Sequence, residues 1–470
     1  MYTGFYSLGA AEEVTGSKHV LEVDGQSYLI DCGAFQGSRA ETDRKNRDLG
    51  IEVDRIESVI LTHGHLDHCG LLPLLTKRGY RGNIYATPAT RDIASLIMMD
   101  SANIQARDAN YLKSKAQKNG EKFDWTPLYT EHDAIAAVGQ TIGVSYNRPM
   151  YIGDGISLEF YDAGHILGSA IASIKIKKGG EELNILATGD LGRKGKPIIR
   201  NPAIPETPAD YIILESTYGD RRHDSTDDAI EKLAAIAKRT VKNRGKILIP
   251  SFAIERTQEL VYYFHMLTDR GIIPEVPIFV DSPMATNATT IFQVHPECYG
   301  EEIKEAFIKH HKNPFGFNSL YFTTSVQESK ALNDHPGPLI IISADGMCEA
   351  GRIQHHLIHN IQDPNTTIMT VGYMAENTLG RRIRNRESEV KIHGEWFRLK
   401  AQVEEINAFS AHSDYFEMLE WLKAVDTSRL KGIFLVHGEK KSQTFLKKYL
   451  EENGFPNVEI VKYGKTYELN

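Results

Sequence analysis

Cysteine is scarce in this chain, and none of it is arranged in pairs. The 470 residues include only four cysteines, and no two of them form a C-x-x-C motif: Cys32, Cys69, Cys298 and Cys348. A framework of disulfide bonds is therefore not expected, and the composition fits the reducing environment of the cytoplasm.

Long hydrophobic runs and a surplus of basic residues are also missing. No uninterrupted apolar stretch is long enough to span a bilayer, and residues 1–5 lack the basic and apolar segments of a secretory signal. We therefore expect no membrane partner. The formal net charge of −8 argues against broad electrostatic binding of nucleic acid. It leaves room for a nuclease whose metal ions supply positive charge locally.

One short stretch concentrates side chains that can bind a metal ion. The apolar run 58–62, which reads as a buried strand, leads directly into His63, His65, Asp67 and His68. Imidazole and carboxylate are ligands that Zn²⁺ prefers. An extended backbone would place His63 and His65 on the same side, whereas Asp67 and His68 come where the chain turns. The spacing therefore suggests two adjacent metal ions rather than one.

Further polar side chains stand at the ends of other apolar runs. Each follows a strand-like segment and lies beside glycine, serine or threonine: His165, Asp190, Glu215 and His437. Such repetition is typical of a site built on a rigid sheet. Asp31 also ends an apolar run. From the residues alone it could be a turn residue or a carboxylate that orients a ligand histidine.

The pattern of predicted strands and helices changes in the middle part of the sequence. At 470 residues the chain is too long for one simple core, so two or three lobes are expected. From about residue 218 to 390, continuous apolar strands alternate with helical stretches, which predicts a parallel sheet covered on both faces. Three histidines of this region, His355, His356 and His359, are interpreted as ordinary residues of a helix surface.

Taken together, these residues resemble the motifs of the metallo-β-lactamase fold, and specifically of its β-CASP branch of nucleases. The likeness runs over nearly the whole chain and is carried by Asp31, the cluster 63–68, His165, Asp190, Glu215, His412 and His437. The pattern is most similar to bacterial relatives of the endonuclease subunit of the eukaryotic pre-mRNA cleavage and polyadenylation factor.

The resemblance implies an α/β fold, namely a metallo-β-lactamase αββα sandwich with an inserted α/β β-CASP domain. Residues 1–217 would form the N-terminal part of the lactamase-like domain, residues 218–392 the insertion, and residues 393–470 the C-terminal part. Family habit also favours a homodimer.

The resemblance further implies two Zn²⁺ ions per chain. One would be held by His63, His65 and His165, and the other by Asp67, His68 and His437. Asp190 would bridge the two ions, and Asp31 would orient a ligand histidine from behind. Two zinc ions acidify a shared water, and the resulting hydroxide attacks phosphorus in line.

The expected catalytic residues are Asp67, Asp190, Glu215 and His412. Asp67 and Asp190 act through the metal ions. His412 would give a proton to the leaving 3′ oxygen, while Glu215 holds the other ring nitrogen and keeps the ring protonated.

Phosphate contacts are predicted in the second lobe. Ser251 precedes a helix start, where free N–H groups favour anions, and a strand-end loop carries Ser343 and Gly346. Guanidinium forks suit phosphate geometry, which adds Arg256, Arg352 and Arg381 to the candidates. The run 381–386 reads equally well as a solvated face.

The function expected from these observations is a zinc-dependent ribonuclease that cuts single-stranded RNA in a cleft between lobes, internally or from a 5′ end. DNA stays possible, because the chemistry does not use the 2′-hydroxyl. Two alternatives remain open: a hydrolase of small esters, thioesters or lactams on the same fold, and a non-catalytic RNA-binding subunit. The large insertion argues against the first, and the complete set of ligand residues argues against the second.

Overall fold

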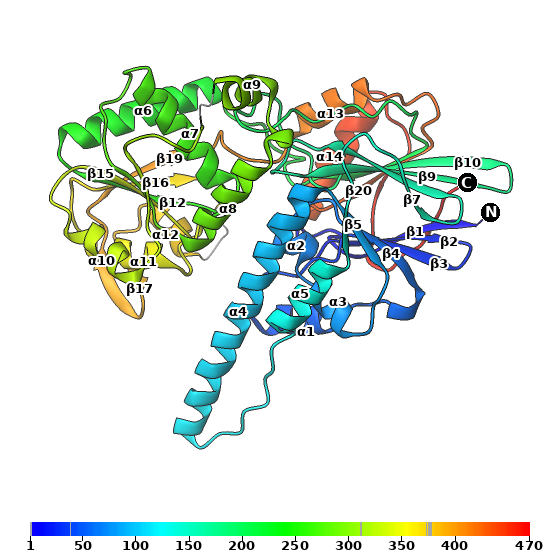
Figure 1. Cartoon of the computed structure of the whole chain (residues 1–470), viewed down its shortest axis with the longest axis horizontal. Helices are drawn as coiled ribbons and strands as arrows, with labels where there is room; N and C mark the ends of the chain where they lie inside the picture. Colours follow the sequence, from blue (N-terminus) through cyan, green and yellow to red (C-terminus); the bar gives the residue numbers. More distant parts are fainter. Residues whose placement is uncertain (1, 38, 311–312, 373, 375–377) are drawn as a thin grey trace. The chain divides into compact units, whose positions relative to one another are not determined.

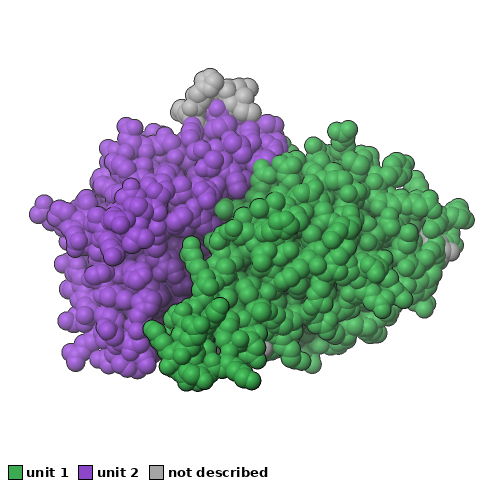
Figure 2. Space-filling model, turned by 60° about the horizontal axis from the view of Figure 1, so that its bottom comes forward, with its two compact units in different colours: residues 1–222, 412–470 green, residues 223–411 purple. Residues whose placement is uncertain are grey.

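The computed structural model describes residues 2–37, 39–310, 313–372, 374 and 378–470. They form two compact units: unit 1 comprises residues 1–222 and 412–470, and unit 2 comprises residues 223–411 (Figure 2). The domain limits expected from the sequence, 217/218 and 392/393, stay a prediction. Within the described ranges, no helix combines the length and apolarity that crossing a membrane requires.

The first of two seven-stranded sheets in unit 1 has the order β22-β1-β2-β3-β4-β5-β6. Its strands are β1 (Thr3–Gly9), β2 (Lys18–Val23), β3 (Gln26–Ile30), β4 (Ile56–Ile60), β5 (Asn83–Ala86), β6 (Thr141–Gly143) and β22 (Tyr467–Glu468). The hairpin between β2 and β3 turns at Asp24 and Gly25, whose φ angles are 48° and 87°. Positive φ at both positions matches the right-handed twist of the two strands.

The second sheet of unit 1 has the order β21-β20-β11-β10-β9-β8-β7. Its strands are β7 (Met150–Gly153), β8 (Ile156–Asp162), β9 (Ala170–Lys178), β10 (Glu181–Ala187), β11 (Tyr211–Glu215), β20 (Gly432–Val436) and β21 (Val458–Ile460). Strands β10, β11 and β20 run parallel to one another, so their carboxyl ends lie at the same edge of the sheet.

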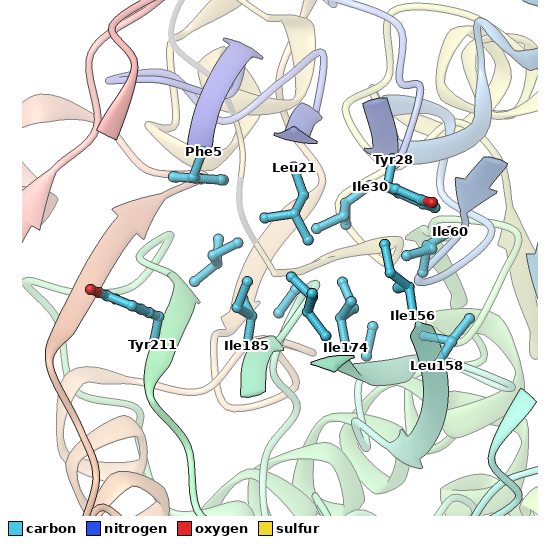
Figure 3. Close-up of a cluster of buried hydrophobic side chains, with 14 of the residues drawn as sticks. Phe5, Leu21, Tyr28, Ile30, Ile60, Ile156, Leu158, Ile174, Ile185 and Tyr211 are labelled. Atoms are coloured by element: carbon cyan, nitrogen blue, oxygen red, sulfur yellow. The ribbon is translucent and has the colours of Figure 1, made fainter. Parts of the chain in front are cut away.

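The two sheets pack face to face through an apolar core. Phe5, Leu21 and Ile60 point inward from the first sheet and meet Ile174 and Ile185 of the second (Figure 3). Side chains alternate between the two faces of a strand, so the same strands also offer apolar residues to the outer faces. The buried sheet pair is therefore a rigid base for whatever its strand ends carry.

Helices cover the outer faces of both sheets (Figure 1). Beside the first sheet lie α1 (Arg39–Arg47), α2 (Leu66–Cys69), α3 (Leu72–Lys77), α4 (Pro88–Asn119) and α5 (Glu131–Gly139). Beside the second lie α13 (Tyr415–Ala424) and α14 (Lys440–Glu452), which bury Trp421 and Leu446 against Ile433. The helix–sheet–sheet–helix layering confirms the predicted αββα sandwich.

Unit 2 is built on a six-stranded parallel sheet of order β14-β13-β15-β12-β16-β19. The strands are β12 (Lys246–Pro250), β13 (Ile278–Val280), β14 (Leu320–Phe322), β15 (Leu339–Ser343), β16 (Thr367–Val371) and β19 (Gln402–Ile406), with a hairpin of β17 (Glu389–Ile392) and β18 (Glu395–Arg398). The intervening helices are α6 (Thr226–Lys242), α7 (Arg256–Asp269), α8 (Pro283–Val294), α9 (Glu301–His310), α10 (Val326–Asp334), α11 (Arg352–Asn360) and α12 (Leu379–Arg384). Figure 1 shows α6 and α11 on opposite sides of this sheet, as predicted.

Candidate metal centre

The residues predicted to bind metal all belong to unit 1 and come from the ends of its strands. The cluster 63–68 follows β4, His165 follows β8, Asp190 follows β10 and His437 follows β20. Because these strands lie in two packed sheets, residues from distant parts of the chain come together at one edge of the sandwich. His68 and His437 illustrate this, since their Nε2 atoms lie 3.2 Å apart.

A first group of ligand atoms surrounds one point. His65 Nδ1 lies 3.1 Å from His63 Nε2 and 3.2 Å from His165 Nε2. Asp190 Oδ2 lies 3.4 Å from both His63 Nε2 and His165 Nε2. Four ligands placed tetrahedrally at about 2.0–2.1 Å from a zinc ion would be about 3.3 Å from one another. The spacing of this group therefore fits one tetrahedral zinc ion.

A second group lies beside the first and also includes Asp190. His437 Nε2 lies 3.2 Å from His68 Nε2 and 3.4 Å from Asp67 Oδ2. The other carboxylate oxygen of Asp190, Oδ1, lies 3.3 Å from His68 Nε2. Each oxygen of Asp190 thus faces a different group, which is the arrangement that a bridging ligand requires.

The protonation of His63 and His65 also suits a cation. Burial is the main cause that lowers the pKa of His63 and of His65, in each case to about 4, so both rings are neutral and offer a lone pair at neutral pH. Within the described part of the chain, Asp190 Oδ1 is buried without a hydrogen-bond donor. A buried carboxylate oxygen of this kind is costly unless a cation satisfies it.

Hydrogen bonds behind the ligands fix their orientation. Asp31 Oδ2 accepts from His68 Nδ1 at 2.7 Å and from Thr62 Oγ1 at 2.8 Å. Thr217 Oγ1 lies 3.0 Å from His437 Nδ1. Asp31 and His437 have φ angles of 61° and 51°, unusual for non-glycine residues. Such backbone strain persists only where the surrounding contacts hold it in place.

His412 and Glu215 form a pair beside these groups. His412 Nδ1 lies 3.0 Å from Glu215 Oε1, and 3.8 Å from Asp190 Oδ2. Burial works against the charged ring, but the charges of Glu215 and Asp190 outweigh it and raise the pKa of His412 to about 9. Glu215 is itself fixed, because its Oε1 accepts a hydrogen bond from Leu191 N at 2.8 Å.

Several supporting residues were not predicted from the sequence. Thr62 and Thr217 were passed over, although each stands beside a motif residue. The backbone of Ser17 also takes part, because its N–H donates to Asp67 O at 2.8 Å and its carbonyl accepts from Gly33 N at 2.9 Å. Gly33 has no room for a side chain, since a Cβ there would lie 1.5 Å from Asp67 O. Only a glycine at position 33 allows this close approach.

The candidate phosphate contacts lie in unit 2 and fall into separate places. Ser251 and Ser343 are neighbours at the ends of β12 and β15, where Ser251 N donates to Ser343 O at 3.0 Å, and Gly346 follows on the adjoining loop. Arg256 is buried and paired with Glu259. The roles of these residues stay predictions.

The two remaining arginines lie on helices of unit 2. Arg352 Nη1 donates to Asp281 Oδ1 at 2.6 Å, and Arg381 is half-buried on α12. The interpretation of the neighbouring histidines is correct for His355 and His359, which are exposed. It is wrong for His356, which is buried because its Nε2 donates to Asp281 Oδ2 at 2.6 Å.

Comparison with known protein families agrees with this layout. Residues 15–102 match the metallo-β-lactamase superfamily and residues 257–383 match the Beta-Casp domain. Residues 392–461 match a family described as the Zn-dependent metallo-hydrolase RNA specificity domain.

Similar proteins extend over the whole chain. The chain is 35% identical to Ribonuclease TTHA0252 of Thermus thermophilus over 97% of its own length and 98% of that protein. It is 31% identical to the transcription termination factor FttA of Methanosarcina mazei over 97% of this chain and 71% of FttA. A crystal structure of a protein of unknown function from Enterococcus faecalis V583 shares the fold, with a TM-score of 0.57, 12% identity and full coverage of both chains.

Proposed function

Because the chain belongs to the β-CASP family of metallo-hydrolase ribonucleases, we propose that it is a zinc-dependent nuclease that hydrolyses phosphodiester bonds of single-stranded RNA. The observation that carries this proposal is the pair of ligand groups that share Asp190. Family membership supports a metal-dependent nuclease; the zinc, the single-stranded substrate and the roles of individual residues are the finer part of the proposal.

Two zinc ions would be held by this chain's own side chains. His63, His65 and His165 would bind one, Asp67, His68 and His437 the other, and Asp190 would bridge them. When bound, such a pair acidifies water and neutralises charge on a phosphodiester oxygen. Asp31 and Thr217 keep His68 and His437 turned toward the ions, because each of these residues contacts the Nδ1 atom of its histidine.

His412 would supply the proton that the leaving oxygen needs. With Nδ1 directed at Glu215, Nε2 is the nitrogen that would donate to the substrate. The raised pKa of His412, about 9, keeps a proton on the ring at neutral pH. Glu215 orients the ring and stabilises its charge, a division of roles that general acid catalysis uses widely.

The wider setting of the proposal is a cytoplasmic enzyme of RNA processing. Residues Ser251, Arg256, Ser343, Gly346, Arg352 and Arg381 are the candidate contacts to RNA phosphates, and a homodimer is the candidate assembly. Sedimentation of the purified chain tests the dimer, and an Arg381→Ala variant with a raised KM and an unchanged kcat would support the phosphate role.

The function is tested with end-labelled single-stranded RNA and DNA of equal sequence. Purified protein is stripped with a chelator and then supplied with Zn²⁺, and product lengths are read from a sequencing gel. We expect cleavage of RNA that depends on added zinc, and the ladder of products distinguishes internal cutting from trimming at the 5′ end. RNA that stays intact with zinc bound would overturn the proposal.

A further inference from the structure

Unit 1 carries exposed aromatic rings on the two helices that begin just after His412 and His437. Phe416 of α13 and Phe445 of α14 are 36% and 44% exposed. Tyr415 joins the helices, because its ring centroid lies 5.4 Å from that of Phe445 and 4.9 Å from that of Tyr449. Phe445 and Tyr449 are themselves stacked, with 6.2 Å between centroids and 16° between planes. Tyr415, Phe445 and Tyr449 therefore form one ring cluster across α13 and α14, and Phe416 follows Tyr415 on α13.

Cationic side chains lie among these rings. The guanidinium of Arg222 is 4.7 Å from the centroid of the Phe416 ring. Lys441 and Lys448 stand one turn before and one turn after Phe445 on α14, and their side chains are 87% and 78% exposed. We call this set of six residues the aromatic–basic strip: Arg222, Tyr415, Phe416, Lys441, Phe445 and Lys448.

The acidic neighbours of the strip do not neutralise it firmly. Lys441 Nζ lies 3.4 Å from Asp220 Oδ2, and Lys448 Nζ lies 3.7 Å from Glu452 Oε1. The Lys448–Glu452 pair is exposed on both sides, and such pairs are worth little, at about 0–1 kcal/mol. Asp220 is only 10% exposed, but the side chain of Lys441 is 87% exposed, so most of its ammonium group faces the solvent. Both ammonium groups can therefore also contact a phosphate that approaches the strip.

The strip connects to the metal centre through residues 218–222. The ring of Tyr218 is stacked beside that of His412, with 6.0 Å between centroids and 25° between planes. The guanidinium of Arg221 lies 5.4 Å from the Tyr218 ring. A Cβ at Gly219 would lie 2.9 Å from Ser442 Oγ, which places this loop against the first turn of α14. Tyr218 and Arg221 thus lie between His412 and the helices α13 and α14.

We propose that the aromatic–basic strip binds unpaired nucleotides of the RNA whose phosphodiester bond lies at the metal centre. Stacking on aromatic rings holds bases of any sequence, and interleaved cations hold the backbone. A protein partner fits less well, because lysine is depleted in the cores of protein interfaces. Paired strands fit less well too, because their bases are already stacked on one another. This inference rests on the proposed function and extends it to a second contact with the same substrate.

The test uses the full zinc-loaded chain and compares Phe416→Ala/Phe445→Ala with a matched control. The control is Tyr151→Ala, which removes an 80% exposed ring from β7 of the same unit. Kinetics are measured on labelled single-stranded RNA and on bis(4-nitrophenyl) phosphate, which is too small to reach the strip. We expect the double variant to raise KM for RNA roughly 5- to 30-fold. Its kcat, and its rate on the chromogenic ester, should equal those of the control.

A second variant measures the cationic part of the strip. Lys441→Gln/Lys448→Gln removes two charges while the rings remain. For single strands the logarithm of affinity falls with the logarithm of salt by about 0.7 for each phosphate that is neutralised. The salt slope of kcat/KM for RNA should therefore become shallower by about 1.4.

The possible outcomes separate this inference from the proposed function. Equal KM values for the double variant and the wild type, with RNA still cleaved, would overturn the strip alone. An equal loss on RNA and on the chromogenic ester would also overturn it, since the variant would then have disturbed the site. Dissociation of an oligomer without a change in KM would assign the rings to a second copy of the chain. If the wild type cleaves the ester but not RNA, the proposed function itself fails, and the inference with it.

Discussion

In the described part of the chain, each unit has a buried aspartate that follows a strand and has histidine beside it. In unit 1, Asp190 follows β10 and has His63, His68, His165 and His437 around it. In unit 2, Asp281 follows β13 and contacts His356 and Arg352. Both carboxylates are almost completely buried, with 2% and 0% of their side chains exposed. Burial and position at a strand end therefore do not distinguish the two aspartates.

The atoms that face each other do distinguish them. Around Asp281 every short contact joins a donor to an acceptor: His356 Nε2 and Ser329 Oγ donate to Oδ2, each at 2.6 Å, while Arg352 and Thr323 donate to Oδ1. Around Asp190 the nitrogens stand 3.3–3.4 Å away, and imidazole nitrogens face one another at 3.1–3.2 Å. Imidazole nitrogens arranged in this way are suited to a cation among them. The Asp281 cluster is complete without one.

The largest effect on zinc content should come from replacing one of the two aspartates, Asp190, and not the other, Asp281. Asp190→Asn removes the charge shared by both ligand groups, so bound zinc should fall well below one ion per chain and RNA cleavage should fall to background. Asp281→Asn should keep the full complement of zinc. Mass spectrometry of the metals in both purified variants checks this. Equal metal loss in the two would erase the distinction between the clusters.

His412 tests whether a histidine beside the ligand groups of unit 1 acts as a general acid or as a metal ligand. His412→Ala should keep both zinc ions and lose about 10²–10⁴-fold in kcat, the contribution of a general acid. The loss should nearly vanish on bis(4-nitrophenyl) phosphate, because nitrophenolate leaves without protonation. Single-turnover rates on both substrates provide the measurement. A variant that loses metal instead would show that His412 is a ligand.

Asp31 tests whether the surroundings of a ligand matter as the hydrogen bonds suggest. Asp31→Ala frees the ring of His68, which Asp31 holds at 2.7 Å, and should weaken zinc binding by about 10–100-fold. Asp210→Ala is the matched control in the same unit, because this buried carboxylate pairs with Arg429 at 2.8 Å. Competition with a zinc-binding dye gives both affinities. An unchanged affinity in Asp31→Ala would reduce Asp31 to a turn residue.

The sequence alone predicted those features of the metal centre that depend on residues close together in the chain. The spacing of His63 and His65 and the apolar runs before His165 and Asp190 could be read directly, since a strand end fixes where the next side chain stands. The convergence of His68 with His437 could not be read in this way, because no local period relates residues so far apart. It was expected only through the family resemblance, which carries the folded arrangement with it.

His356 shows where local reading fails. It lies on a helix that also carries the exposed His355 and His359, and the sequence pattern alone predicts a surface residue. Burial of a histidine depends on a partner from another element, and here the partner is Asp281, at the end of β13. Thr62 and Thr217 were missed for the same reason, since a hydroxyl gains its role only from the ligand that it contacts.

The smallest effect on the metal centre, and the largest on unit 2, is expected from Asp281→Asn. Burial raises the pKa of the Asp281 carboxyl, but hydrogen bonds from His356, Ser329, Thr323 and Arg352 outweigh it and hold the pKa well below its usual value. The variant leaves Arg352 without its counter-charge, which typically costs about 3–5 kcal/mol of stability. Faster hydrogen exchange in peptides of β13 and α11, with normal exchange in β10, would confirm that the loss is confined to unit 2.

The pH dependence of the same region has a defined sign. A carboxyl whose folded pKa is lowered contributes stability above its unfolded pKa of about 3.9, and that contribution is lost as the pH falls toward the folded value. In the wild type, protection of β13 and α11 should therefore decrease as the pH falls below about 4. In Asp281→Asn the decrease should be shallower, because the titrating group is gone. Identical pH profiles in the two proteins would show that Asp281 does not hold this part of unit 2 together through its charge.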